Sequence, residues 1–279
     1  MVFERKYETV SVGNGLLLLW ICNSIYDAEI AMKADIDWIF VDIEVRGKNV
    51  RQPKSSFISD HKLSDVGVIK AGLPDAKVVL RLNPLHHGTS SEVEDAISFG
   101  ADAIMLPMFS SLNELIGVRD LIRGRAQFWP LVETPSACRL MSDIDIGSLG
   151  LDRLHFGLND LRLALDYRFM FSPLLDSRVT DALYSVRASR IPFGLGGVSK
   201  LNQGALLGSD VLHLNFLLGS SAVILSQEFR RSAKNGSLAL SVAALREHWS
   251  SLQGSDRADT SSTLTDIYKK VRNLELSTV

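Results

Sequence analysis

The sequence predicts a single (β/α)8 barrel, the TIM-barrel class of α/β fold, with additional helices at its C-terminal end. Short runs rich in Val, Ile, Leu and Phe recur about every 30 residues, which is the length of one βαβ unit. Within each run the apolar residues are nearly continuous, as in parallel strands that are covered on both faces. A doubly wound sheet would carry a glycine-rich turn after its first strand, where this chain has Cys22, Asn23, Ser24 and Ile25.

Each element of the barrel has its own signal in the sequence. The strands are expected at Leu16–Cys22, Trp38–Ile43, Lys77–Leu82, Ala103–Leu106, Gln127–Val132, Arg153–Phe156, Pro192–Leu195 and Val211–Phe216. Helices are expected at Ser24–Ala34, Ser90–Phe99, Ser111–Arg123 and Ser136–Ile146. Each begins at a serine, and Gly100, Gly124 and Gly147 follow the last three, which is the usual marking of helix ends.

We expect the barrel to occupy residues 1–232 and a helical extension to occupy residues 233–279. The extension has helical patterns over Ser237–Trp249 and Leu264–Leu274. The first of these presents enough apolar surface to pack either on the barrel or on a neighbouring subunit.

The composition argues against several classes of protein. The chain of 279 residues has 30 Lys plus Arg and 32 Asp plus Glu and no long basic stripe, so it offers little for nucleic acid to bind. Its longest apolar run, Leu16–Cys22, is far shorter than the roughly 20 residues of a membrane helix. The charged first ten residues lack a secretory signal, and two cysteines build no disulfide framework. We therefore expect a cytoplasmic enzyme with no nucleic-acid or membrane partner.

The active site of such a barrel lies at the C-terminal ends of its strands. Arg81 ends the third expected strand, Glu133 follows the fifth and Asp160 follows the sixth. Two carboxylates at one barrel mouth repel each other unless a cation lies between them. Oxygen ligands without a nearby cysteine favour Mg²⁺ or Mn²⁺, and other divalent metals are possible. Water and a chelating substrate would fill the remaining coordination positions.

Five segments of the chain resemble the HpcH/HpaI aldolase and citrate lyase family. They are AEIAMKADIDWIFVDIE (28–44), VVLRLNP (78–84), GADAIMLPMFSS (100–111), LVETPSA (131–137) and LHFGLNDL (154–161). Any one of them is a weak signal, but all five stand in the family's order at expected strand ends. The resemblance extends from about Leu16 to about Arg230.

The resemblance implies a metal-dependent lyase that makes or breaks a 2-oxo acid aldol through a metal-bound pyruvate enolate. By position, Glu133 and Asp160 would bind the metal, and Arg81 would lie over the 2-oxo acid. The backbone N–H groups of Asn159 and Asp160 would hold the substrate carboxylate, and Pro107 would border the substrate. A metal ion acting as a Lewis acid and an arginine that is always protonated both stabilise an enolate.

The chain also departs from the family at the residues that move protons. The aldolase branch has a histidine directly after the acid here numbered Glu44, and this chain has Val45. The branch often has a glutamine where this chain has Leu131. We therefore count Glu44 and His86 with Arg81 as candidate catalytic residues, because imidazole is the natural base near neutral pH. His87 is a second candidate.

Several of these residues also have structural interpretations. Arg81 could form a salt bridge to Asp42 or Glu44, and those two acids could orient metal-bound waters. The basic residues Arg46, Lys48, Arg51 and Lys54 form either a solvated loop or an attractor for an anionic substrate. The run Gly194–Gly197 forms either a phosphate-binding turn or a tight turn that only glycine permits.

The expected activity is cleavage or formation of a carbon–carbon bond between a 2-oxo acid and an aldehyde. The alternatives are a citrate-lyase-like enzyme acting on a CoA thioester and a non-catalytic relative that binds an oxo acid. The resemblance further implies a homo-oligomer, a hexamer or trimer of dimers.

Overall fold

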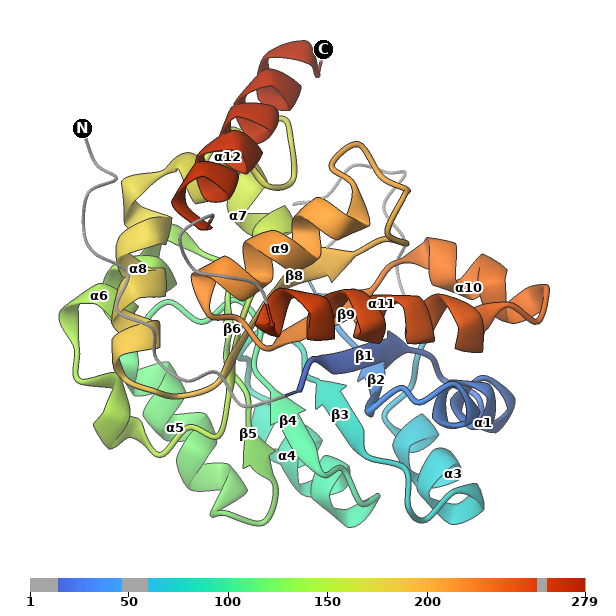
Figure 1. Ribbon diagram of the computed structural model, residues 1–279. Helices are drawn as coiled ribbons and strands as arrows, with labels where there is room; N and C mark the ends of the chain where they lie inside the picture. The colour runs from blue at the N-terminus through green and yellow to red at the C-terminus, as the bar shows by residue number, and fades with distance from the viewer. Residues whose placement is uncertain (1–14, 47–59, 255–259, 279) are drawn as a thin grey trace.

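The computed structural model describes residues 15–46, 60–254 and 260–278 and shows a barrel of parallel strands surrounded by helices (Figure 1). The strands are β1 (Leu17–Ile21), β2 (Trp38–Asp42), β3 (Val78–Arg81), β4 (Ala103–Met105), β5 (Gln127–Phe128), β6 (Leu131–Val132), β7 (Leu154–Phe156), β8 (Phe193–Val198) and β9 (Ala222–Leu225). Their order in the sheet is β5-β4-β3-β2-β1-β9-β8-β7-β6, and every pairing is parallel.

The sheet closes through the run that was expected as one strand, Gln127–Val132. Proline has no N–H group, so Pro130 separates the run into β5 and β6. The N–H groups of Trp129 and Leu131 donate to carbonyls on the β4 side, and the carbonyl of Pro130 accepts from His155 on the β7 side. The two ends of the sheet are thus one strand, and the (β/α)8 prediction is confirmed.

Helices follow the strands around the outside of the barrel (Figure 1). Those of the barrel are α1 (Ile25–Lys33), α3 (Ser64–Gly72), α4 (Thr89–Ser98), α5 (Leu112–Ile122), α6 (Pro135–Asp143), α7 (Leu158–Ala164), α8 (Ser177–Ala188), α9 (Gly208–Leu218) and α10 (Gln227–Lys234). Two short 3₁₀ helices, η1 (Ile146–Leu149) and η2 (Ser172–Leu175), lie in the connections. Ser24 and Ser111 cap α1 and α5 as the sequence predicted, whereas Thr134 caps α6.

The expected eighth strand was wrong. Residues Val211–Phe216 lie inside helix α9, and the strand at that position of the barrel is β9, later in the chain. The physical reason is visible in the burial pattern, because Val211, Leu214, Asn215 and Leu218 are buried with the spacing of one helix face. A dense apolar run of six residues suits a buried helix as well as a buried strand.

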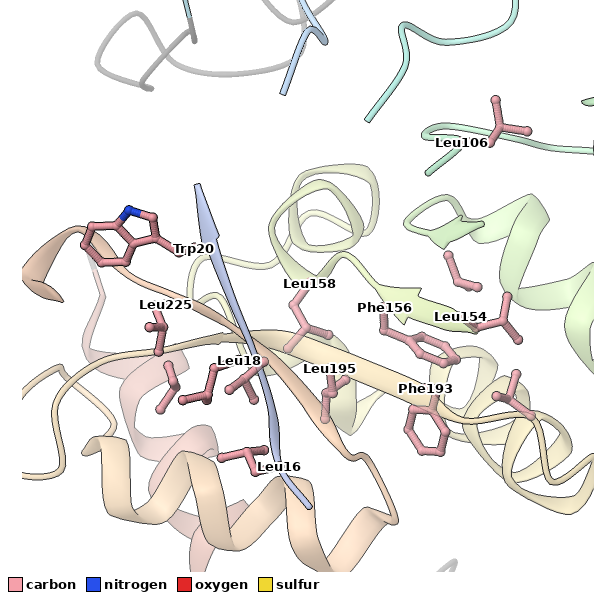
Figure 2. Close-up of a cluster of buried hydrophobic side chains, with 14 of the residues drawn as sticks. Leu16, Leu18, Trp20, Leu106, Leu154, Phe156, Leu158, Phe193, Leu195 and Leu225 are labelled. Carbon is pink, nitrogen blue, oxygen red and sulfur yellow. The ribbon is translucent and has the colours of Figure 1, made fainter. Parts of the chain in front are cut away.

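Side chains alternate between two apolar clusters on opposite faces of the sheet. The inner cluster fills the barrel and contains Leu19, Phe40, Val79 and Trp129 among others. The outer cluster lies between the strands and the helices. Figure 2 shows part of the outer cluster, where Leu18 of β1, Leu195 of β8 and Leu225 of β9 come together. The alternation directs the inward side chains at the C-terminal strand ends toward the barrel axis.

The C-terminal extension consists of α11 (Leu238–Gln253) and α12 (Thr260–Ser277), and both helices contact the barrel. Trp249 of α11 packs edge-to-face on Phe216 of α9, with ring centroids 5.6 Å apart. Lys270 of α12 forms an ion pair with Asp210 of α9 at 2.8 Å. In the described chain, no helix is both long and apolar enough to span a membrane.

Histidine 155 is buried inside the barrel, and glycines of β8 make the space for it. Its Nε2 lies 3.1 Å from the carbonyl oxygen of Gly196, which has a φ of +58°. A Cβ atom at Gly194 would lie 2.2 Å from Nδ1 of the same ring. The run Gly194–Gly197 therefore lies within strand β8 and is not the turn after it. Both interpretations of this run as a turn were wrong.

The buried imidazole should make stability depend on pH. Burial, together with the charges of Arg153 and Arg81, lowers the pKa of His155 to about 4, even though the carbonyl oxygen of Gly196 accepts a hydrogen bond from the ring. Below the unfolded-state pKa of 6.5 the unfolded chain takes up a proton that the folded chain refuses. Stability from this group is complete above pH 6.5 and is lost as pH falls toward 4, by about 3 kcal/mol in total.

Urea unfolding of the wild type and His155→Gln at pH 7 and pH 4.5 checks this expectation. The free energy of unfolding should fall more steeply in the wild type than in the variant. Equal falls in the two proteins would contradict the account of His155 as a buried neutral group.

Candidate functional site

A cavity of about 550 Å³ lies at the C-terminal ends of the strands. Inward side chains at the strand ends, among them Asp42, Arg81, Glu133 and His155, form its floor. Asn159 and Asp160 at the start of α7 also line it. The structure thus brings together Arg81, Glu133, Asn159 and Asp160, four residues that the sequence predicted for the site.

Arg81 is held in a buried ion pair with Asp42. Its Nε and Nη2 atoms donate to the two oxygens of Asp42 at 2.9 Å and 2.8 Å, and Nη2 lies 3.4 Å from Oε2 of Glu44. Burial alone would lower the pKa of Arg81, but the charges of Asp42, Glu44 and Glu133 outweigh it and raise the pKa. The salt bridge of the structural interpretation is therefore present. It uses two of the three guanidinium nitrogens on a side chain that lines the cavity.

Glu133 is almost completely buried, with 1% of its surface exposed. Its Oε1 accepts a hydrogen bond from the backbone N–H of Met108 at 2.9 Å. Burial raises the pKa of Glu133 well above its usual value, and the charges of Asp160 and Glu44 raise it further. Arg81 and the Met108 N–H act in the opposite direction without restoring it. Glu133 therefore gives up its proton less readily than a solvated glutamate does.

Two backbone features that the sequence analysis missed place Glu133. Met108 has a φ of +55°, the left-handed region that non-glycine residues rarely adopt. That conformation belongs to the residue whose N–H meets the carboxylate. On the other side, a Cβ atom at Gly157 would lie 2.6 Å from Oε2 of Glu133. The glycine of the segment LHFGLNDL is therefore required by the buried acid.

Four acids lie together at the mouth of the barrel. Asp42 and Glu44 pair with Arg81, and the charges of Arg81, Asp160 and Glu44 all act on Glu133. Buried carboxylates that lie close together are the setting in which a divalent cation binds strongly. Glu133 and Asp160 are the two of these acids that the sequence predicted as metal ligands, and both line the cavity. Their hard oxygen atoms suit Mg²⁺ or Mn²⁺.

Within the described residues, no group of three or more His, Cys, Asp and Glu side chains has the arrangement of a metal site. A metal held by Glu133 and Asp160 would therefore take most of its ligands from water and substrate. An open coordination sphere of that kind is typical of catalytic metals, which bind substrate directly.

His86 and Pro107 do not line the cavity. The ring of His86 is held from both sides, because Nε2 lies 3.0 Å from Glu92 and Nδ1 accepts from the N–H of Gly88. Glu92 also accepts a hydrogen bond from the side-chain amide of Asn83. The Oδ1 atom of the same Asn83 side chain accepts hydrogen bonds from the backbone N–H groups of Val45 and Arg46. His86 thus belongs to a network that supports the chain just after Glu44.

Other residues named from the sequence are placed as follows. His87 lies exposed in the same loop as His86, with the two rings 5.5 Å apart. Leu131 lines the cavity, and Val45 is half exposed. Lys48, Arg51 and Lys54 lie outside the described residues. The cavity residues that the sequence analysis missed include His155 and the segment Phe169–Phe171.

No family model matches the chain, and no curated protein matches it. Solved structures do match. An HpcH/HpaI aldolase/citrate lyase family protein from Burkholderia cenocepacia is 15% identical, with a TM-score of 0.60 over 80% of this chain and 93% of that one. An HpcH/HpaI aldolase from Desulfitobacterium hafniense is 12% identical, with a TM-score of 0.58 over 80% and 91%. The citrate synthase SbnG is 14% identical, with a TM-score of 0.55 over 83% and 95%. At such identities the likeness establishes the fold.

Replacement of Gly157 by alanine tests the packing around Glu133. The added methyl group meets the buried side chain, so Gly157→Ala should lower the free energy of unfolding by about 1–3 kcal/mol. Gly117 in α5 is the matched control, because a Cβ atom there meets nothing within 4 Å. Gly117→Ala should be neutral or stabilise by up to about 1 kcal/mol. Urea unfolding distinguishes them, and equal effects would contradict the packing account.

Proposed function

We propose that the protein is a divalent-metal-dependent carbon–carbon lyase that cleaves or forms the aldol of a 2-oxo acid. The observation that supports this most is the cluster of buried carboxylates beside Arg81 at the mouth of the barrel. The likeness in fold to HpcH/HpaI aldolases and the five resembling segments agree with it. A 2-oxo acid, typically pyruvate, and an aldehyde are the proposed substrates.

Glu133 and Asp160 would hold the metal, either Mg²⁺ or Mn²⁺. When bound, the metal would supply Lewis-acid stabilisation of the enolate oxygen and would keep both carboxylates ionised. The Met108 N–H and the space at Gly157 fix Glu133, and the first turn of α7 fixes Asp160. Asn159 and Asp160 would border the carboxylate of the substrate. Glu44 would add its charge beside Arg81 without contacting substrate.

Arg81 would stabilise the negative charge that develops on the oxygen of the 2-oxo group. The ion pair to Asp42 keeps its guanidinium in one orientation, so little reorganisation is needed when the charge appears. In the synthetic direction a proton leaves C3 of the oxo acid, and C3 then forms a bond to the aldehyde carbon. The aldehyde oxygen takes up a proton and becomes the hydroxyl of the product.

His86 would act as a positioning residue. Through Glu92 and Asn83 it supports the backbone at Val45 and Arg46, next to Glu44. A base would have to reach the substrate inside the cavity, and His86 does not line it. His86→Ala should therefore keep measurable activity, whereas loss of a base would remove it.

Exchange of deuterium into the methyl group of pyruvate, followed by NMR, tests the proposal without knowledge of the aldehyde. The wild type should exchange with Mg²⁺ or Mn²⁺ and not with EDTA. Glu133→Gln and Asp160→Asn should lose exchange. Arg81→Ala should retain metal binding and slow exchange by about 10²–10³-fold. Glu29→Gln, which removes a half-exposed acid of α1 that pairs with Lys33, is the matched control and should behave as wild type.

The outcomes separate the alternatives. Metal-dependent binding of pyruvate without exchange would favour a non-catalytic oxo-acid-binding protein. Full exchange in Asp160→Asn, or exchange that persists in EDTA, would contradict the proposed metal site.

A further inference from the structure

Part of the lining of the cavity is apolar. Phe169, Met170 and Phe171 line it from the connection between α7 and η2, and Leu206 lines it from the connection between β8 and α9. We call these four residues the apolar wall. The rings of Phe169 and Phe171 are 5.8 Å apart, and Phe171 lies 3.9 Å from the position that a Cβ of Gly196 would take. The wall therefore reaches over the end of strand β8.

Helix α12 holds the apolar wall in place. The carboxylate of Glu275 accepts from the backbone N–H of Arg168 at 3.1 Å and from that of Phe169 at 2.9 Å. The side chain of Arg168 in turn donates to the carbonyl oxygen of Thr278 at 3.1 Å. Helix α12 also contacts η2, the short helix that directly follows this segment. The extension thus fixes the backbone of a cavity-lining segment although it lies outside the barrel.

The place where barrels often bind phosphate contains a carboxylate in this protein. That place lies after the last two strands of the barrel, near the N-terminal end of a helix. Here Glu228 stands in the first turn of α10, lines the cavity and accepts a hydrogen bond from the hydroxyl of Ser226. That hydrogen bond lowers the pKa of Glu228, so its negative charge persists. A phosphate group at this position would be repelled.

One cation, Arg230, lies on the same side among the described residues that line the cavity. Its Nη2 donates to the carbonyl oxygen of Ile21 at 2.5 Å, which ties it to the end of β1. Glu228 precedes Arg230 by two residues on the same helix. One donor of Arg230 is thus used by the scaffold, and the carboxylate of Glu228 is the negative charge that would oppose an anionic substituent of the substrate.

We propose that the aldehyde partner is unphosphorylated and carries an apolar group that packs on the apolar wall, and that Glu275 positions this wall. The inference rests on the proposed function and adds its substrate class. The new carbon–carbon bond joins C3 of the oxo acid to the aldehyde carbon, whose apolar substituent then lies against Phe169, Met170 and Leu206. The aldehyde oxygen is protonated, and no further co-reactant is needed.

Synthesis from pyruvate and a series of aldehydes tests the substrate class. From acetaldehyde to hexanal, kcat/KM should rise by up to about fourfold for each methylene group that becomes buried. Glyceraldehyde 3-phosphate and succinic semialdehyde should be poorer substrates than hexanal. Phe169→Ala should flatten the rise along the series, and it should lower kcat/KM for hexanal more than it slows deuterium exchange into pyruvate. Leu240→Ala, at a site 76% exposed on α11, is the control.

The ratio of kcat/KM for hexanal to kcat/KM for acetaldehyde tests Glu275 as a positioning residue. Glu275→Ala should reduce the preference for hexanal over acetaldehyde by raising KM for hexanal, while exchange into pyruvate stays at the wild-type rate. Glu275→Gln keeps one oxygen acceptor and should restore part of the preference. Glu247→Ala, an exposed acid of α11, should have no effect.

The exchange assay distinguishes failure of this inference from failure of the proposed function. Normal exchange together with a preference for a phosphorylated or carboxylated aldehyde would overturn the substrate class. Normal exchange and an unchanged preference in Glu275→Ala would overturn the role of α12. Absence of exchange in the wild type with any metal would overturn the proposed function and this inference with it.

Discussion

The rest of the candidate site depends on the ion pair between Arg81 and Asp42. Three further acids lie near this pair at the mouth of the barrel. Asp42 accepts two hydrogen bonds from the guanidinium, and Oε2 of Glu44 lies 3.4 Å from its Nη2. Glu133 and Asp160 are buried in the same region, where loss of solvent disfavours a charged carboxylate. Burial, together with the charges of Asp160 and Glu44, raises the pKa of Glu133. A divalent cation would stabilise the ionised carboxylates, and the proposed chemistry depends on the same cation.

Several unusual backbone positions make room for the buried side chains of the site. Gly157 leaves room for Glu133, Gly194 leaves room for His155, and Met108 adopts a left-handed conformation beside the carboxylate. Such features cost folding free energy and persist only where the surrounding packing enforces them. Here the surrounding packing is the outer apolar cluster, which fixes the strands whose inward residues form the site. Two features therefore form the site. Side chains alternate along the strands and so direct every second residue inward, and glycines stand where a larger residue would clash with a buried side chain.

Much of this arrangement could be predicted from the sequence, because it follows from local pattern. Arg81, Glu133 and Asp160 each stand at a strand end, and parallel strands in a barrel bring their C-terminal ends together. The eighth strand could not be predicted in the same way, since the buried face of α9 and a buried strand have the same composition over six residues. His86 lies in the loop that follows an active-site strand, as a catalytic base would, but its ring contacts Glu92 and does not line the cavity. Residues in the connections follow no periodicity, so the apolar wall and its link to Glu275 required the three-dimensional structure.

The central claim, that the buried carboxylates form a site for a divalent metal, is tested most directly by binding of Mn²⁺ to the apoprotein. Titration calorimetry should show one Mn²⁺ per chain in the wild type, and the thermal midpoint should rise with Mn²⁺ concentration because the ion binds only the folded state. Glu133→Gln should abolish both effects, whereas Glu29→Gln should keep them. Wild-type protein that binds no divalent metal, or Glu133→Gln protein that binds Mn²⁺ as the wild type does, would contradict the account.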